Sequence, residues 1–292
     1  MRKLVALLTA LLLLCSAALA EAPASLPIDF SPGHAADPAL FSENGYQDES
    51  ITVTMERVWV GDARYNVARV KIADASQLRT ALAAPFGTKK TNKISTIAKN
   101  NNAVVAIGGD YFGNEEGGFV VRQGETHRKK PRKGYDMLII DEKGDFHIIK
   151  GSGAEELKAV MDTGIQLVNV FNFGPALVVD SVLQEMPEDY NYNIFGTEPR
   201  CAIGQTGPLE YVLVVVDGRD AADSKGCRVS ELAQFMLEQG CVQAYNLDGG
   251  NSALMVFGEE NYSQKSFKAE RSVSDIIYFA TAVDFGLDNA EE

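Results

Sequence analysis

The sequence predicts an α+β protein with a central mixed β-sheet, flanking helices, a C-terminal βαβ unit and a β-meander. Three observations lead to this fold class. Apolar and polar residues alternate from Ile51 onward, short glycine-punctuated apolar runs fill residues 118–150, and a strand–helix–strand succession occupies residues 211–247. Hydrophobic residues make up 46% of the chain and charged residues 23%, which is ordinary globular composition. Residues 51–292 are therefore predicted to form one folded domain.

The N-terminal fifty residues are predicted to lie outside this domain. Two basic residues precede the apolar run Leu4–Leu14, and small residues close the segment at Ala20, which is the pattern of a signal peptide over residues 1–20. Residues 21–50 are rich in Pro, Ala, Ser and acidic residues without any period, which predicts a tether or loosely packed arm. No later segment approaches the roughly 20 apolar residues of a membrane span. We therefore expect an exported protein, secreted or in the cell envelope, with no transmembrane span.

The first predicted elements are two strands, a helix and a third strand. Residues 51–60 and 65–73 alternate and are separated by the turn segment Gly61–Arg64. Thr91–Lys99 carries its apolar residues at helical spacing. A strand over residues 103–107 follows and ends in Gly108-Gly109-Asp110.

Residues 118–150 contain three short alternating runs separated by glycines and charges, as in a β-meander. The basic run His127–Lys133 lies inside this segment. A solvated loop tip and a contact to an anionic substrate both fit the run, and the sequence leaves both readings open.

The most informative segment is the predicted βαβ unit. Tyr211–Val216 is a continuous β-branched run, typical of a strand covered on both faces, and Asp217 follows it. Ser230 offers a helix N-cap, Gly240 a stop, and the strand Cys241–Leu247 then ends in Asp248. Parallel strands bring their carboxyl ends to one sheet edge, where ligands bind, so Asp217 and Asp248 should be neighbours. Asp110 becomes a third carboxylate if its strand joins the same sheet in the same sense.

Charge and cysteine content exclude several classes of function. The formal net charge of −13 disfavours nucleic acid and anionic membranes as partners. Three cysteines remain beyond the signal peptide: Cys201, Cys227 and Cys241. Either Cys227 and Cys241 form a disulfide, or all three are buried free thiols. The chain has 3 histidines, which argues against a histidine-based triad or a histidine-rich metal site.

Paired carboxylates at one edge suit two kinds of chemistry. One is glycosidic bond hydrolysis, in which one carboxyl protonates the leaving oxygen and the other acts as base or nucleophile. The other is the binding of a hard divalent cation through oxygen ligands. The loop Asp217–Asp223 has acids for a cation, but Arg219 lies between them and the EF-hand spacing is absent. We therefore predict no cofactor and keep a divalent cation as the alternative.

Three arginines lie beside the same segments and add a second kind of group to the predicted site. Guanidinium groups bind phosphate oxygens with a two-pronged geometry, so carboxylates with Arg200, Arg219 and Arg271 predict a substrate that is both sugar and phosphate. A structural salt bridge is the alternative for each arginine. Ser252 lies in GGNSA, which is not a nucleophile elbow, and is given a hydrogen-bonding role.

Six motifs in this order resemble the phosphodiester glycosidase family. They are AIGGDYF (106–112), GPALVVD (174–180), PRCAIG (199–204), LVVVDGR (213–219), SELAQFMLEQG (230–240) and NLDGGNSA (246–253). The resemblance implies an exported hydrolase acting on a phosphorylated glycan or sugar-1-phosphodiester, N-acetylglucosamine-1-phosphodiester among them. It implies a reactive or phosphate-holding set and a supporting set on the matching positions. The first is Asp110, Arg200, Asp217, Arg219 and Asp248; the second is Glu231, Gly249, Gly250, Ser252 and Arg271.

The chain departs from the family at Gly108-Gly109, where Asn-Gly is usual, so an amide that would contact the substrate or support the site is missing. We expect Asp248, favoured over Asp217, to act at the anomeric carbon while Arg200 and Arg219 hold the departing phosphate. Two other functions are weighed against this one: a metal-dependent phosphodiesterase acting at the P–O bond, and a non-catalytic glycan-binding module of the cell envelope.

Overall fold

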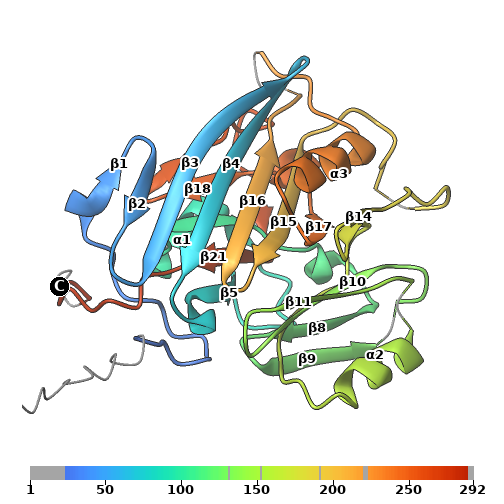
Figure 1. Cartoon of the computed structure of the whole chain (residues 1–292), viewed down its shortest axis with the longest axis horizontal. Coiled ribbons are helices and arrows are strands. Elements are labelled where there is room, and N and C mark those ends of the chain that lie inside the picture. The colour runs from blue at the N-terminus through green and yellow to red at the C-terminus, as the bar shows by residue number, and fades with distance from the viewer. Residues whose placement is uncertain (1–23, 131, 152, 191, 220–222, 289–292) are drawn as a thin grey trace, which may run out of the picture.

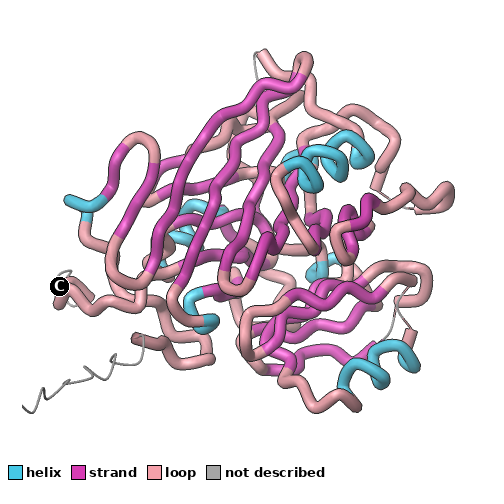
Figure 2. Tube along the Cα trace, in the orientation of Figure 1, coloured by secondary structure: helices cyan, strands magenta, loops and turns pink. Residues whose placement is uncertain are grey.

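The computed structural model of the chain describes residues 24–288, except 131, 152, 191 and 220–222. The predicted signal peptide, residues 1–20, lies outside the described residues. Within them the chain forms three sheets of five or more strands, with few and short helices (Figures 1 and 2). None of these helices is long and apolar enough to cross a membrane.

The large sheet has nine strands, and its central strands stand side by side in Figure 1. Its strands in spatial order are β1 (Phe41–Ser42), β2 (Gly45–Gln47), β3 (Ile51–Val60), β4 (Ala63–Ile72), β16 (Glu210–Val216), β15 (Arg200–Gly207), β17 (Gln243–Leu247), β13 (Ala176–Val179) and β14 (Val182–Leu183). The predicted strand pair from Ile51 is confirmed, with Val60 opposite Ala63 across a two-residue turn.

Two five-stranded sheets complete the body. The β7 sheet has the order β19 (Glu260–Asn261), β18 (Met255–Phe257), β7 (Val105–Gly108), β21 (Asp275–Phe279) and β5 (Leu78–Leu82). The β10 sheet has the order β11 (Phe146–Ile149), β10 (Met137–Asp141), β12 (Leu167–Phe171), β8 (Gly118–Arg122) and β9 (Glu125–Lys130). A short pair joins β6 (Asn92–Lys93) to β20 (Ser272–Val273).

The main core lies where the inner faces of the three sheets meet, and each helix covers an outer face. Apolar side chains of the large sheet, β7, β18, β21, β10 and β12 form one cluster. On the outer faces, α3 (Val229–Glu238) packs on the large sheet, α1 (Ile94–Asn100) on the β7 sheet and α2 (Ala154–Met161) on the β10 sheet. Short 3₁₀ turns cover Pro38–Leu40, Ala75–Gln77, Phe112–Asn114 and Gly250–Ser252.

Strand β16 is covered on both faces, as its composition predicts. Tyr211, Leu213 and Val215 enter the main core, whereas Val212, Val214 and Val216 pack with α3. The helix begins earlier than predicted: its N-cap is Arg228 instead of Ser230, because the Glu231 carboxylate accepts a hydrogen bond from the Arg228 backbone N–H at 2.7 Å.

The expectation of a mixed sheet with a paired βαβ unit is wrong in its topology. All strand pairs in the described residues are antiparallel. Strand β15 forms a hairpin with β16 on one side and pairs with β17 on the other. Strands β16 and β17 therefore run in the same direction with β15 between them. Their carboxyl ends share an edge, but two strand spacings, about 10 Å, separate them.

The β10 sheet corrects the predicted meander. It consists of two hairpins, β8 with β9 and β10 with β11, and β12 from later in the chain lies between them. Residues 127–130 of the basic run lie in the edge strand β9 and not at a loop tip, whereas Lys133 lies in the turn that follows.

Residues 24–50, for which the sequence predicts a tether or loosely packed arm, pack on the body instead. The buried Arg79 guanidinium donates hydrogen bonds to the backbone carbonyls of Pro27, Asp29 and Ser31, while Leu26 is buried beside α1. All three described cysteines are buried free thiols, which is the second of the two predicted alternatives, and Cys227 forms no disulfide with Cys241.

Candidate active site

The Asp-Gly-Gly loop after β17 lies at the seam between two sheets. The backbone N–H of Asp248 donates to the Gly109 carbonyl at 3.2 Å, and that of Gly250 donates to the Pro199 carbonyl at 2.8 Å. Gly109 follows β7 and Pro199 precedes β15, so the loop is bonded to both sheets. Asp110 thus reaches Asp248 from a different sheet, and not from the shared sheet that the sequence left open.

Behind Asp248 lies a buried cluster of two carboxylates and one guanidinium. Arg122 on β8 pairs with Asp275 on β21, Nε to Oδ2 at 2.7 Å, and with Asp110, Nη2 to Oδ1 at 3.0 Å. All three side chains are almost fully buried. The guanidinium also packs on the Phe171 ring, 4.0 Å from its centroid, and donates from Nη1 to the backbone carbonyls of Val121 and Val170. Each of the three sheets therefore has a residue at the site or directly behind it.

The remaining bonds of Asp110 fix its orientation. Its Oδ1 accepts a hydrogen bond from the Phe112 backbone N–H at 3.1 Å, and its Oδ2 accepts one from the Asn172 backbone N–H at 3.2 Å. With Arg122 on the same side chain, Asp110 is held on both oxygens, which suits a residue that positions its neighbours.

The electrostatic setting makes ionisation at the centre of this cluster more costly than in water. Burial raises the pKa of Asp248 to about 6, Asp110 adds to the rise, and the Ser252 hydroxyl and Arg271 lower it. Burial also raises the pKa of Asp275, against the pull of Arg122. Asp248 is partly exposed, unlike Asp110 and Asp275, so it is the member of the cluster that meets solvent.

Arg271 is the solvent-exposed cationic side chain near Asp248. Its side chain is exposed, its guanidinium lies 5.9 Å from the centroid of the Tyr111 ring, and its charge lowers the pKa of Asp248. Within the described part of the chain it forms no ion pair, unlike Arg122. A guanidinium free in this way can take a substrate anion beside Asp248.

The other two predicted arginines are engaged with the protein. Arg219 lies over the loop, with Nη1 donating to Asn251 at 2.7 Å and Nε paired with Glu198 at 2.7 Å. Arg200 is buried and donates to the backbone carbonyls of Cys227, Asn193 and Gly196. Arg219 can therefore contribute charge to the loop, whereas Arg200 braces the segment before β15.

Asp217 lies away from this cluster. Its carboxylate pairs with Arg64 on β4 at 2.7 Å and accepts a hydrogen bond from the Gln264 backbone N–H at 2.9 Å. Burial raises its pKa, while Asn66 and Arg64 lower it. Among the described residues it has no contact with Asp248 or Asp110, so a catalytic role for it stays a prediction.

The supporting residues divide between the loop and the helix. The Ser252 side chain is buried and hydrogen-bonded to Asp248, and Gly250 has a φ of +57°, close to the Arg219 guanidinium. A side chain at Gly249 would collide with the Pro199 carbonyl, 2.7 Å from its Cβ. Glu231 caps α3 and contacts none of these residues among the described ones.

The glycine pair at the end of β7 fits closely around the same cluster. A Cβ on Gly108 would lie 3.1 Å from the Ser252 carbonyl oxygen, and one on Gly109 would lie 2.6 Å from Cγ of the buried Asp275. A side chain at Gly108, where the family has Asn, would thus point toward the Asp-Gly-Gly loop. With glycine at this position, the backbone of the loop at Ser252 packs directly against β7.

Gly109→Ala should lower the free energy of unfolding by about 1–3 kcal/mol, because the new methyl group forces the buried Asp275 carboxylate to shift. Urea unfolding measures this change. Gly207→Ala on β15 is the matched control, since its Cβ would meet the Glu210 carboxylate at an ordinary 3.6 Å. Equal stability of the two variants would contradict the close fit at Gly109.

Sequence reasoning missed Arg122 and Asp275. Both carry a usable signal: each is a charged residue at one end of an otherwise apolar strand, Arg122 last in GFVVR and Asp275 first in DIIYF. A charge in such a place is seldom buried without a partner. The pattern gives no partner by itself, because the two strands belong to different sheets.

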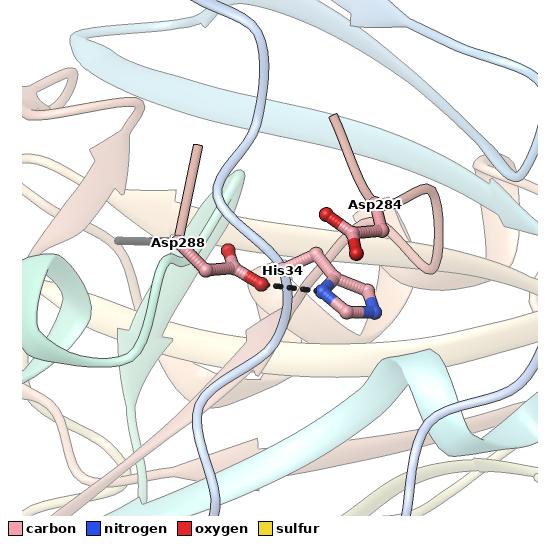
Figure 3. A group of neighbouring side chains, drawn as sticks. All are labelled: His34, Asp284 and Asp288. Atoms are coloured by element: carbon pink, nitrogen blue, oxygen red, sulfur yellow. Dashed lines mark hydrogen bonds and ion pairs between the residues drawn. The ribbon is translucent and has the colours of Figure 1, made fainter. Parts of the chain in front are cut away.

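One group of metal-ligand side chains lies elsewhere, where the N-terminal arm meets the C-terminal segment (Figure 3). His34, Asp284 and Asp288 place their ligand atoms within 4.8 Å of one another. His34 Nδ1 already pairs with Asp288 at 2.6 Å, and both aspartates are exposed. This group ties down residues 24–50 and takes no part in the site around Asp248.

Comparison with known proteins finds one matching family model and several similar proteins. A family model described as phosphodiester glycosidase matches residues 101–280. The chain is 28% identical over 194 residues to the SPbeta prophage-derived uncharacterized protein YomE of Bacillus subtilis, which covers 66% of this chain and 30% of that protein. It is 26% identical over 212 residues to N-acetylglucosamine-1-phosphodiester alpha-N-acetylglucosaminidase of Bos taurus, which covers 65% of this chain and 39% of that protein. The matches thus span well under half the length of these relatives.

Solved structures agree on the fold. The catalytic domain of the zebrafish N-acetylglucosamine-1-phosphodiester alpha-N-acetylglucosaminidase, auto-inhibited by its pro-peptide, superposes with a TM-score of 0.63 and 16% identity, over 85% of this chain and 87% of that one. A hypothetical protein from Synechocystis superposes with a TM-score of 0.54 and 18% identity, over 79% of this chain and 62% of that one. At these identities the likeness shows the α+β fold alone.

Proposed function

The chain belongs to the phosphodiester glycosidase family, and we propose that it hydrolyses the bond between the anomeric carbon of a sugar and the oxygen of a phosphodiester. The products are free sugar and a phosphate monoester. N-acetylglucosamine-1-phosphodiester is the first substrate to test, because the bovine relative is named for it. The N-terminal signal pattern supports export of the enzyme.

One observation carries this proposal: a partly exposed carboxylate, Asp248, lies beside an exposed cation without an ion-pair partner in the described chain, Arg271. A sugar phosphodiester has the matching pair of groups, an electrophilic anomeric carbon and an anionic phosphate. Neither a neutral glycoside nor an isolated phosphate would use both.

The proposed mechanism gives each group one task. Ionised Asp248 either attacks the anomeric carbon, forming a glycosyl ester that water then hydrolyses, or takes a proton from the attacking water. In both routes the carbon–oxygen bond breaks with its electrons passing to the phosphate oxygen. Arg271, with Arg219 close by, stabilises the charge that gathers on the phosphate. A phosphate monoester leaves readily, so a strong general acid is not required. Arg122 holds Asp110 and Asp275 in place behind the reacting carboxylate.

The pH profile should report the ionisation of Asp248. Because its pKa is raised to about 6 and the ionised form reacts, kcat/KM should rise as the pH increases through about 6. Arg271→Gln removes a positive charge that favours the carboxylate, so the midpoint should move to higher pH while kcat/KM falls. A flat profile between pH 5 and 8 would contradict this role for Asp248.

Hydrolysis in ¹⁸O-labelled water tests the function itself. Label in the released sugar supports cleavage at the anomeric carbon. Label in the phosphate supports the alternative of a phosphodiesterase acting at the P–O bond and overturns the proposal. Saturable binding of the phosphodiester without any product, at high enzyme concentration, would identify a glycan-binding module instead.

A divalent cation fits this cluster poorly. The oxygens of Asp110 are bonded to Arg122 and to two backbone N–H groups, and Asp275 Oδ2 is paired with Arg122. A cation there would have to displace a buried guanidinium of the same charge sign. Activity that persists after dialysis against EDTA is therefore the expected result.

A further inference from the structure

A cavity of about 590 Å³ opens beside the candidate site and has no task in the proposed hydrolysis. Its walls come from the loop of residues 84–90, the segment of residues 112–116, strand β9 and Ser274. Phe86 and Phe112 stack with ring centroids 5.4 Å apart and form an apolar base.

The cavity is basic although the protein as a whole is acidic. Four cationic side chains line it, Lys89, Lys90, Arg128 and Lys130, against the carboxylates of Glu115 and Glu116. Glu115 is occupied by Arg132 at 3.2 Å and by the Tyr192 hydroxyl at 2.6 Å. The formal net charge of the chain is −13, so this local excess of cations is not a general property of its surface.

Carboxylates of the described residues do not neutralise the lysine side chains of this cavity. Lys89, Lys90 and Lys130 are exposed and form no ion pair in the described part of the chain. Lys71, Lys99 and Lys225 are paired with Glu210, Glu259 and Asp62. Free ammonium groups around one cavity are available to an anion. Arg128 is partly buried and pins the wall, since it donates to the carbonyls of Gly118, Phe112 and Glu115.

Two stretches of backbone lead from the site into this cavity. One begins at Asp110 and reaches the cavity wall at Phe112 and Gly113. The other begins at Arg271, beside Asp248, and reaches the wall at Ser274. Three extended residues span at most about 10 Å, so the cavity wall at Ser274 lies within that distance of the backbone of Arg271, the proposed phosphate-binding arginine.

We propose that this basic cavity binds a second phosphate group on the aglycone, the part of the substrate that leaves with the phosphodiester. This inference rests on the proposed function and narrows its substrate class to multiply phosphorylated glycans or polyol phosphates. Arg271 takes the phosphate that is attached to the anomeric carbon, and the three lysines take the next phosphate along the aglycone. The Phe86 and Phe112 rings support the apolar carbon atoms between them.

A pair of substrates with the same sugar tests the inference. In one, the phosphodiester carries a methyl group; in the other, it carries a 2-phosphoethyl group. The wild-type enzyme should have a KM about tenfold lower for the 2-phosphoethyl ester, with similar kcat, and the advantage should shrink as salt is added. In the triple variant Lys89→Gln, Lys90→Gln, Lys130→Gln the ratio of the two KM values should fall from about ten to about one.

Two further variants separate charge from side-chain shape. Arginine at the same three positions should restore the ratio, since the positive charges return. The matched control is the triple variant Lys71→Gln, Lys99→Gln, Lys225→Gln, which removes three exposed lysines outside the cavity and should keep the wild-type ratio. Equal KM values for both substrates with the wild-type enzyme would overturn the inference and leave the proposed function standing.

Binding without turnover distinguishes the two proposals. Inorganic triphosphate is titrated calorimetrically into the Asp248→Asn protein, with and without the lysine substitutions. Loss of binding in the lysine variant supports the cavity even if neither ester is hydrolysed by the wild type, in which case the proposed function fails alone. Equal binding of triphosphate by both proteins overturns the proposal that the cavity binds a phosphate group.

Discussion

Asp248→Asn is expected to reduce kcat/KM for a sugar-1-phosphodiester by about 10²–10⁴-fold, the usual contribution of a reacting acid–base group. The amide has nearly the same size and can still bond to Ser252, but it can neither attack the anomeric carbon nor accept a proton. The measurement is the initial rate of free sugar release at pH 7. Wild-type turnover by a folded Asp248→Asn protein would remove Asp248 from the reaction.

The same variant should be no less stable than the wild type at pH 7. The pKa of Asp248 is raised in the folded protein to about 6, so between about pH 4 and pH 6 the folded state binds more protons than the unfolded state. The stability that this carboxyl contributes is therefore lost as the pH rises through that interval. Asn has no such dependence, and thermal unfolding at pH 4.5 and pH 7 checks the sign.

Asp217→Asn is the matched control for the loss of a buried carboxylate. Its effect should fall on stability, because it weakens the pair with Arg64 on β4, and the folded fraction should keep most of its kcat. A folded Asp217→Asn protein without activity would restore Asp217 to the catalytic set that the sequence predicts.

Arg122→Met is expected to cause the largest loss of stability, about 3–5 kcal/mol, which is typical when one partner of a buried ion pair is removed. Met keeps much of the packing against Phe171 but leaves Asp110 and Asp275 buried without their shared cation. Urea unfolding measures the loss. It should grow as the pH rises, because burial raises the pKa of Asp275 and the variant has no Arg122 to oppose that rise, so the ionised carboxylate is more costly.

A second substitution tests this cause directly. Arg122→Met with Asp275→Asn removes one of the two orphaned charges and should recover part of the lost stability. Arg69→Met is the control on the surface, where the pair with Glu56 at 3.5 Å is about half exposed and should contribute at most about 1 kcal/mol. A similar effect for Arg122→Met and Arg69→Met would show that the buried cluster is not an electrostatic unit.

The sequence predicts elements better than their arrangement. Strand β16 and helix α3 follow from local patterns, because alternation and apolar spacing reflect which faces are buried. The insertion of β15 between β16 and β17, and of β12 between β10 and β8, does not follow. The pairings of β15 with β17 and of β12 with β8 join segments far apart in the chain, and each strand has a pattern that fits several neighbours. The assumption that a helix joins two bonded parallel strands therefore fails here.

The site is predictable to a similar degree. Asp248 and Asp110 each follow a strand and adjoin glycines, so their place in loops is visible in the sequence. Their proximity comes from the hydrogen bond between Asp248 and Gly109 across two sheets, which no local pattern encodes. Arg122 and Asp275 show in the sequence only as charges at the ends of apolar strands, without any sign of their partners. Their charges neutralise each other only after the β10 sheet and the β7 sheet have met.

The pairing of β4 with β16 and of β5 with β21 bears on how the protein can be shortened. The family match begins at residue 101, after both β4 and β5. A fragment trimmed to that match would expose the backbone edges of β16 and β21, two strands that are buried along most of their length. Such edges recruit other chains into intermolecular sheets. A piece that keeps both edges covered must therefore begin ahead of Ala63, well before the segment that matches the family model.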